Sequence, residues 1–158
     1  FLITIITPIT INLFFNFSFL KLPKLFLGDN GSLLFGFIIS FILIFLANQN
    51  FIHPILLAWS IVIFVYEFLS INIIRLKNNQ DPFKAGQDHL HHILFNKTQS
   101  ILITNLSIVL LNLLLFSIGY FSFSLINSLS SLFLFIFLFF FYFIVRNKYS
   151  KKVKIKII

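Results

Sequence analysis

The chain has 158 residues, of which 59% are hydrophobic and 10% charged, with a net charge of +8, a mean hydropathy of +1.02 and no cysteine. About a quarter of the residues of an ordinary soluble domain are charged, so too few polar side chains are present here to cover a soluble fold. The composition indicates an integral membrane protein and excludes a disulfide framework or a thiolate metal site. It also gives no indication of nucleic-acid binding, because the basic residues flank apolar runs instead of forming one basic face.

Apolar runs recur along the whole chain, and about 20 residues are needed to cross the hydrocarbon core of a membrane. The runs are continuous, whereas the strands of an outer-membrane barrel alternate over about ten residues. We therefore predict an all-α, polytopic helical bundle that forms one integral membrane domain over residues 1–158. About five spans are expected, at residues 1–15, 32–47, 54–74, 101–118 and 125–145. Because the chain begins at Phe1 and contains no methionine, we expect it to be the C-terminal part of a longer protein, with a truncated first span.

The basic residues fall on alternate connections of this arrangement. All 12 Lys and Arg lie in loops at about 16–31 and 75–100 or in the basic tail 146–158, whereas 48–53 and 119–127 carry no Lys, Arg, Asp or Glu. Short cytoplasmic loops are enriched in Lys and Arg, so we expect both loops and the tail to be cytoplasmic. The tail is expected to contact anionic lipid headgroups.

A glycine-rich segment precedes the second apolar run. Gly28 and Gly31 permit tight backbone geometry and Asn30 tolerates it, which predicts a sharp turn into a helix. Asp29 or Ser32 would then lie at the helix start and could act as its N-cap. Alternatively, Asp29 is a Mg²⁺ ligand, because Mg²⁺ is commonly held by one or two carboxylates plus substrate phosphates, and a helix N-terminus attracts phosphate. The two roles can coexist if Ser32 is the cap.

Two ionisable residues lie in or beside the third apolar run. Glu67 precedes Arg75 by about two helical turns, or roughly 12 Å. An acid at this depth should face the bundle interior or a wet cavity. Glu67 is therefore predicted either to make an interhelical hydrogen bond or ion pair, or to act directly in catalysis. Arg75 is predicted to anchor the cytoplasmic end of the run.

The polar segment 84–95 holds three of the four histidines and one of the four acidic residues, Asp88. A helix over 88–94 would place His89 and His92 on one face, whereas an extended segment would align His89 with His91. Either geometry can place imidazoles against phosphate oxygens, and neutral histidine can move a proton near pH 7. A Zn²⁺ site and a simply solvated loop are the alternatives.

Taken together, these two polar motifs resemble those of the polyprenyl-phosphate N-acetylhexosamine-1-phosphate transferases. That family includes UDP-GlcNAc:undecaprenyl-phosphate GlcNAc-1-phosphate transferase and the phospho-MurNAc-pentapeptide translocase. Residues 24–37, KLFLGDNGSLLFGF, look like the family's FLGDSGS segment. The aspartate of that segment is a Mg²⁺ ligand in the translocase branch, and the matching residue here is Asp29. Asn16 and Phe17 resemble the Asn-Phe pair that often precedes the segment.

The second match covers residues 81–95, DPFKAGQDHLHHILF, which look like the family's loop of the type PFSPDRxHLHHxL. Histidines of that loop line the active site, and the matching residues are His89, His91 and His92. The chain departs from the family where Gly86 replaces an Asp of many members. The family's paired aspartates and a further Asp-rich loop lie upstream of the residues present here, so we expect this chain alone to be inactive.

The resemblance implies transfer of a sugar-1-phosphate from a UDP-sugar to polyprenyl (undecaprenyl) phosphate, giving UMP and a lipid-linked sugar for envelope polysaccharide. The implied location is the cytoplasmic face of the bacterial inner membrane, and the implied cofactor is Mg²⁺, with Mn²⁺ as an alternative. Asp29 would hold the metal, and the three histidines would meet the diphosphate or uridine end of the donor. The further substrate contacts it implies are Gly28, Asn30, Gly31, Lys24, Arg75 and Asp88. A transporter or channel that uses Glu67 and the histidines, or a non-catalytic relative, is the competing hypothesis.

Overall fold

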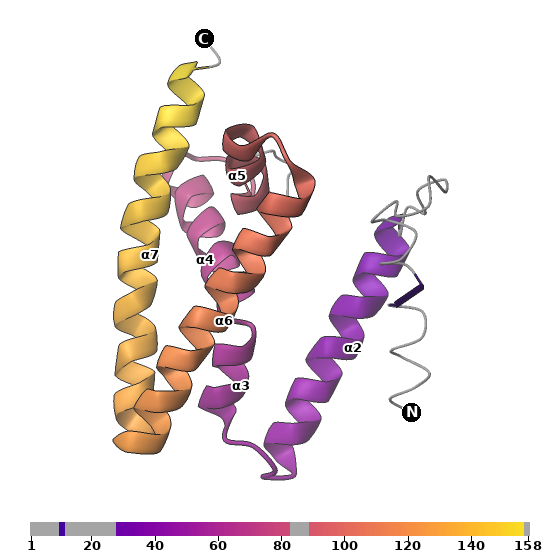
Figure 1. The fold of residues 1–158 in the computed structure, drawn as a ribbon, viewed down its shortest axis with the longest axis vertical. Helices are drawn as coiled ribbons and strands as arrows, with labels where there is room; N and C mark the ends of the chain where they lie inside the picture. The colour runs from indigo at the N-terminus through magenta and orange to yellow at the C-terminus, as the bar shows by residue number, and fades with distance from the viewer. Residues whose placement is uncertain (1–9, 12–27, 83–88, 157–158) are drawn as a thin grey trace. The chain divides into compact units, whose positions relative to one another are not determined.

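The computed structural model describes residues 10–11, 28–82 and 89–156, and the side chains of 10–11, 30–82 and 89–148. No strand occurs among these residues, so the predicted all-α class is confirmed there. The chain divides into two compact units, Phe1–Gln49 and Asn50–Ile158. The helices, labelled in Figure 1, are α2 (Gly28–Asn48), α3 (Pro54–Ser60), α4 (Val62–Lys77), α5 (Leu90–Thr98), α6 (Ile101–Leu125) and α7 (Ser128–Lys156).

Three of these helices are long and apolar enough to cross a membrane, over Asn30–Asn48, Ile101–Leu125 and Ser128–Lys148. The pair α3 and α4 adds a fourth span if it crosses as one broken helix. Most of the first predicted span lies outside the described residues, so a count of five is not confirmed. The span predicted over 54–74 is not one continuous helix, because α3 and α4 meet at a bend of 77°.

The bend occurs at Ile61, whose backbone angles (φ −116°, ψ 23°) depart from those of a helix. A side chain from α6 supplies hydrogen bonds on both sides of the break. The Nδ2 of Asn112 donates to the carbonyl oxygen of Ser60 over 2.9 Å, and its Oδ1 accepts from the amide of Ile63 over 3.3 Å. An unsatisfied backbone group in the bilayer core is unfavourable by several kcal/mol. Asn112 therefore stabilises a broken helix that a purely apolar neighbour could not.

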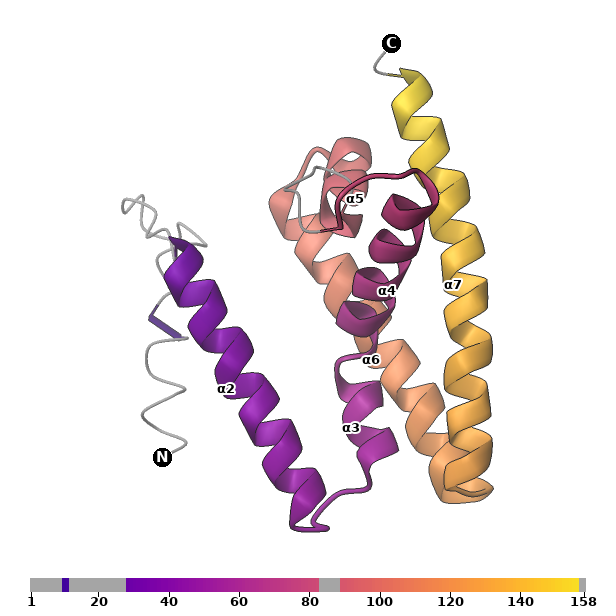
Figure 2. The same cartoon turned by 180° about the vertical axis from the view of Figure 1, so that it is seen from behind.

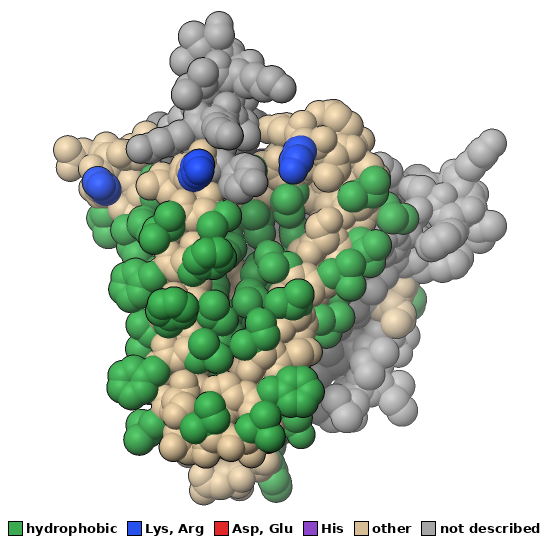
Figure 3. All heavy atoms as spheres, turned by 60° about the vertical axis from the view of Figure 1, so that its left-hand side comes forward, with side chains coloured by type: hydrophobic (Ala, Val, Ile, Leu, Met, Phe, Trp, Pro, Cys, Tyr) green, Lys and Arg blue, Asp and Glu red, His purple; other side chains and the backbone are tan. Residues whose placement is uncertain are grey.

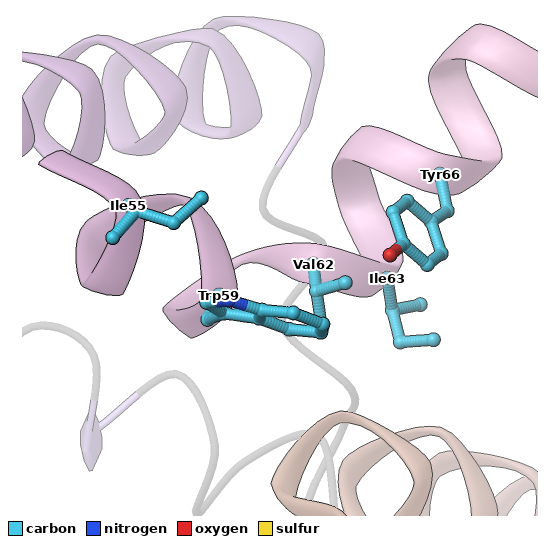
Figure 4. Close-up of a cluster of buried hydrophobic side chains, with 5 residues drawn as sticks. All are labelled: Ile55, Trp59, Val62, Ile63 and Tyr66. Carbon is cyan, nitrogen blue, oxygen red and sulfur yellow. The ribbon is translucent and has the colours of Figure 1, made fainter. Parts of the chain in front are cut away.

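A core of the second unit forms around this break (Figure 4), from Ile55, Trp59, Val62, Ile63 and Tyr66. Trp59 and Tyr66 are fully buried. Phe135 of α7 meets both rings edge-on, at centroid distances of 4.9 and 5.0 Å. The polar atoms of both rings are also satisfied, because Trp59 Nε1 donates to Ser131 Oγ over 2.9 Å and the Tyr66 hydroxyl donates to the carbonyl oxygen of Phe135 over 2.5 Å.

The core also requires a close approach between α3 and α6. A Cβ placed on Gly119 would lie 2.1 Å from Cδ2 of Trp59. Ser131 Oγ donates in turn to the carbonyl oxygen of Gly119 over 3.2 Å. Small residues at helix interfaces allow backbones to approach closely within membranes. Gly119 is therefore the position at which α6 admits the indole ring.

The second unit is polar at one end. Figures 1 and 2 show α3 and α4 end to end beside α6 and α7, with α5 at the end of the bundle where α4 finishes. Figure 3 shows hydrophobic side chains along the helices of one face, and those Lys and Arg side chains of the described residues that are visible there lie at its upper end. The exposed apolar side chains of α6 and α7 suit contact with lipid. The histidine-bearing α5 therefore lies at the end of the bundle where α4 finishes, which is also where α4 carries its own basic residues.

Replacing Gly119 with Ala should lower the free energy of unfolding by roughly 1–3 kcal/mol, the usual range for overpacking a tight site. The added Cβ would overlap the ring of Trp59. Titration of the micellar protein with a denaturing detergent measures this change. Gly36→Ala in α2 is the control, because nothing lies within 4 Å of its Cβ and alanine favours the helix. Equal destabilisation by the two changes would contradict the prediction.

Replacing Asn112 with Ala should destabilise the protein by about 1–2 kcal/mol, because two backbone groups at the break lose their partner. The same detergent titration tests this. Asn105, on α6 and exposed, provides the matched control Asn105→Ala, which we expect to be neutral. A stability that does not change in Asn112→Ala would show that the break does not depend on this side chain.

Candidate functional site

Three imidazoles form a continuous cluster at the start of α5. His89 precedes the helix with an extended backbone (φ −70°, ψ 151°), while His91 and His92 lie in the first turn. The ring of His89 stacks on that of His91 at a centroid distance of 5.6 Å and 17° between planes. The ring centroids of His91 and His92 lie 4.2 Å apart. The extended backbone of His89 and its stacking on His91 match the extended alternative, whereas the ring that His92 contacts is that of His91 and not, as in the helical alternative, that of His89.

The electrostatics of the cluster favour neutral imidazole at its centre. Partial burial and repulsion from His92 and His89 lower the pKa of His91 below its usual value, and the carboxylate of Glu67 acts in the opposite sense. A neutral imidazole can donate one hydrogen bond and accept another. Among the residues that the structure describes, no group of three or more His, Cys, Asp or Glu is arranged to hold a metal ion, so the alternative Zn²⁺ site finds no ligand set there.

Glu67 contacts the first residue of α5, and both of its carboxylate oxygens accept hydrogen bonds. Oε1 accepts from the backbone amide of Leu90, the first residue of α5, over 2.7 Å. Oε2 accepts from the Tyr142 hydroxyl over 2.5 Å and from Nε of Arg146 over 3.2 Å. Nη2 of Arg146 also donates to Oε1 over 3.3 Å. The predicted interhelical hydrogen bond and ion pair of Glu67 are therefore confirmed.

Arg75 lies two turns further along α4 and is buried, with 7% of its surface exposed. Its Nη1 donates to the carbonyl oxygen of Pro82 over 2.8 Å. This bond holds the backbone at Pro82, seven residues before His89. The phosphate contact implied for Arg75 by the resemblance stays a prediction.

The glycine-rich segment starts a helix, as predicted, but its glycines are themselves helical. The helix α2 begins at Gly28, so Asp29 lies in its first turn, as predicted for the start of this helix, whereas Gly28, Asn30 and Gly31 are helical and do not themselves form a turn; the approach to the helix lies outside the described residues. Ser32 is the fifth residue of the helix, so it does not occupy the N-cap position predicted for it.

The predicted site residues fall into separate groups. His89, His91 and His92 come together with Glu67 in the second unit, whereas Asp29 belongs to the first unit. The side chain of Asp29, and all of Lys24 and Asp88, lie outside the described residues. The meeting of Asp29 with the histidines therefore stays a prediction.

Sequence reasoning missed the partners of Glu67. Tyr142 and Arg146 lie 75 and 79 residues after it. One signal was available, because these residues are four apart and share a face of α7, and Arg146 is the first base after the last apolar run. The amide of Leu90 carries no such signal, because every residue except proline has a backbone amide.

Curated relatives are similar to part of the chain, and each is named undecaprenyl-phosphate alpha-N-acetylglucosaminyl 1-phosphate transferase. The chain is 32% identical over 94 residues to that of Yersinia pestis, 36% over 74 residues to that of Pasteurella multocida (strain Pm70) and 33% over 95 residues to that of Escherichia coli (strain K12). These matches cover 56%, 45% and 56% of this chain and 26%, 20% and 26% of the relatives.

The chain thus spans about a quarter of the length of the curated relatives that it matches. No family model matches it, and neither does any solved structure. The relatives nevertheless bear the name of the family that the two sequence motifs indicated. The resemblance is confirmed in these terms: over about half of its residues, this chain is similar to undecaprenyl-phosphate alpha-N-acetylglucosaminyl 1-phosphate transferases.

Proposed function

We propose that the intact protein transfers a sugar-1-phosphate, of the N-acetylhexosamine type, from a UDP-sugar to a polyprenyl phosphate such as undecaprenyl phosphate. The name of the relatives supplies the reaction class. The observation that carries the proposal is the continuous cluster of His89, His91 and His92 at the end of the bundle where α4 finishes. Imidazoles that are stacked together can present several N–H donors to one diphosphate.

In the proposed reaction, an oxygen of the lipid phosphate attacks the β-phosphorus of the UDP-sugar, which bears the sugar. The bond from that phosphorus to the bridging oxygen breaks, and UMP leaves. Phosphoryl transfer depends mainly on positioning and on neutralising the charge of the phosphate oxygens. The imidazoles would donate hydrogen bonds to the diphosphate, and neutral His91 could take up a proton as that charge approaches.

A divalent cation fits this proposal. The carboxylate of Asp29, in the first turn of α2, is an oxygen donor of the kind that Mg²⁺ and Mn²⁺ prefer, and substrate phosphates usually complete the coordination of Mg²⁺. Asp29 would hold the ion, which when bound would neutralise part of the diphosphate charge. Free amides of the same helical turn favour an anion nearby.

The transporter hypothesis gains no comparable support. A relay carboxylate must exchange protons or ions, whereas Glu67 accepts hydrogen bonds from Leu90, Tyr142 and Arg146 at once. We place the reaction at the cytoplasmic face of the bacterial inner membrane, where basic loops are expected. The helix α7 continues to Lys156, so the basic tail would lie near anionic headgroups on that side.

Replacing Asp29 with Ala in the intact gene product should nearly abolish UMP release from a UDP-sugar, because the proposed cation would lose its carboxylate. The measurement is Mg²⁺-dependent turnover in isolated membranes with UDP-GlcNAc and undecaprenyl phosphate. Asp81→Asn is the acidic control, and we expect it to retain turnover. Undiminished Mg²⁺-dependent turnover in Asp29→Ala would remove the metal assignment.

Donor binding should be coupled to proton uptake near pH 7. The pKa of free His91 lies below its usual value of about 6.5, so the ring is mainly neutral, whereas a bound diphosphate favours the protonated ring. Between the free and bound pKa values, a falling pH should therefore tighten binding. Calorimetry of UDP-GlcNAc binding in two buffers of different ionisation enthalpy measures the uptake.

The controls for this experiment are two histidine variants. His91→Gln should reduce the uptake, while His53→Asn should retain it, because His53 caps α3 through a bond to the amide of Ile55 and asparagine can replace it there. Binding without proton uptake in the unsubstituted protein would contradict the assigned role of His91.

A further inference from the structure

One face of α4 carries two charged side chains that contact the backbone at or before the histidine cluster. Glu67, Ile71 and Arg75 are spaced four residues apart and so share this face. Ile71 is 4% exposed and Arg75 is 7% exposed, and the side chain of Glu67 is 13% exposed. These groups are therefore largely buried. Hydrogen bonds to charged groups are stronger in the protein interior than in water.

Both charged side chains bind backbone atoms. Nη1 of Arg75 donates to the carbonyl oxygen of Pro82, seven residues before His89, and Oε1 of Glu67 accepts from the amide of Leu90, within the histidine cluster. The side chain of Leu90 also packs against the core around Trp59. Leu90 is thus held by its amide and by its side chain, and it lies between His89 and His91.

The carboxylate that holds Leu90 is itself fixed from α7. Tyr142 and Arg146 occupy its remaining lone pairs, and the side chain of Arg146 is only 2% exposed. Removing one partner of such a buried pair leaves an uncompensated charge. Since both oxygens of Glu67 already accept hydrogen bonds, the carboxylate is not poised to act as a base or to bind a ligand.

We propose that Glu67 and Arg75 are positioning residues for the histidine cluster. The helix α4 holds the backbone at Leu90, between His89 and His91, and at Pro82, and α7 fixes Glu67 in turn. The three imidazoles consequently keep one arrangement relative to the bundle. The inference rests on the proposed function for its effect on turnover, but the contacts themselves concern only the placement of the imidazoles.

Glu67→Asp is the first test, because it keeps the negative charge and withdraws the carboxylate by about 1.5 Å. It should weaken the bond to Leu90 while an ionic partner for Arg146 remains. In the intact protein with UDP-GlcNAc, we expect kcat/KM to fall about 10- to 100-fold, the scale on which small misplacements of catalytic groups act. The melting temperature in detergent is measured alongside.

A second readout reports the imidazoles directly. Protein labelled with ¹⁵N in its histidines gives ring resonances that single His→Gln variants assign. Glu67→Asp should shift the resonances of His89 and His91, while His53 stays unchanged. Turnover that falls with unchanged ring resonances would overturn the proposal, because Glu67 would then act on substrate or on stability alone. Unchanged turnover and unchanged resonances would also overturn it.

The contact of Arg75 with Pro82 provides an independent test with a matched control. Arg75 and Lys77 both lie in the last turn of α4, but Arg75 is buried against Pro82 and Lys77 is exposed. Arg75→Gln and Lys77→Gln each remove one positive charge. Only Arg75→Gln should shift the ring resonances and lower kcat/KM. Equal effects of the two variants would reduce the role of Arg75 to its charge and overturn this half of the proposal.

These experiments separate the two proposals. If the unsubstituted protein releases no UMP from UDP-GlcNAc or other UDP-sugars, the proposed function fails, yet the ring resonances still decide whether Glu67 and Arg75 hold the cluster. If turnover is present and the resonances of Glu67→Asp and Arg75→Gln match those of the unsubstituted protein, the positioning role fails and the proposed function stands.

Discussion

A carboxylate inside an apolar helix must be paired, and that requirement organises the polar end of the bundle. A charge is strongly disfavoured there unless partners replace its hydration. Glu67 obtains them from the hydroxyl of Tyr142, the guanidinium of Arg146 and the amide of Leu90. One side chain of α4 thereby connects the start of α5 to the C-terminal half of α7. The histidine cluster is placed by this pairing, since it begins beside the amide that Glu67 holds.

The same rule, that buried polar groups require partners, explains the centre of the bundle. The break between α3 and α4 interrupts the backbone hydrogen bonds of a helix, and Asn112 replaces two of them. Trp59 lies beside the break and finds a hydrogen-bond acceptor in Ser131 and space at Gly119. Two kinds of contact therefore meet in one small core, namely hydrogen bonds for polar groups and close backbone approach for a large ring.

These two features bear on the proposed chemistry in different ways. The core around Trp59 supports the break between α3 and α4. The pairing of Glu67 supports the imidazoles at the start of α5. Leu90 connects the two, because its side chain packs against the core and its amide binds Glu67. Precise placement of donors around a diphosphate is what phosphoryl transfer chiefly requires from a protein.

The sequence by itself determined the helical class, the membrane character and the confinement of Lys and Arg to alternate connections and the tail. Composition and the length of apolar runs are local properties. It also supplied the two motifs, including His89, His91 and His92. Only the tertiary structure decided that the span predicted over 54–74 breaks at Ile61, and that Glu67 pairs with groups 23, 75 and 79 residues away. These outcomes depend on which side chains meet when helices pack, and neither hydropathy nor spacing along one helix specifies such meetings.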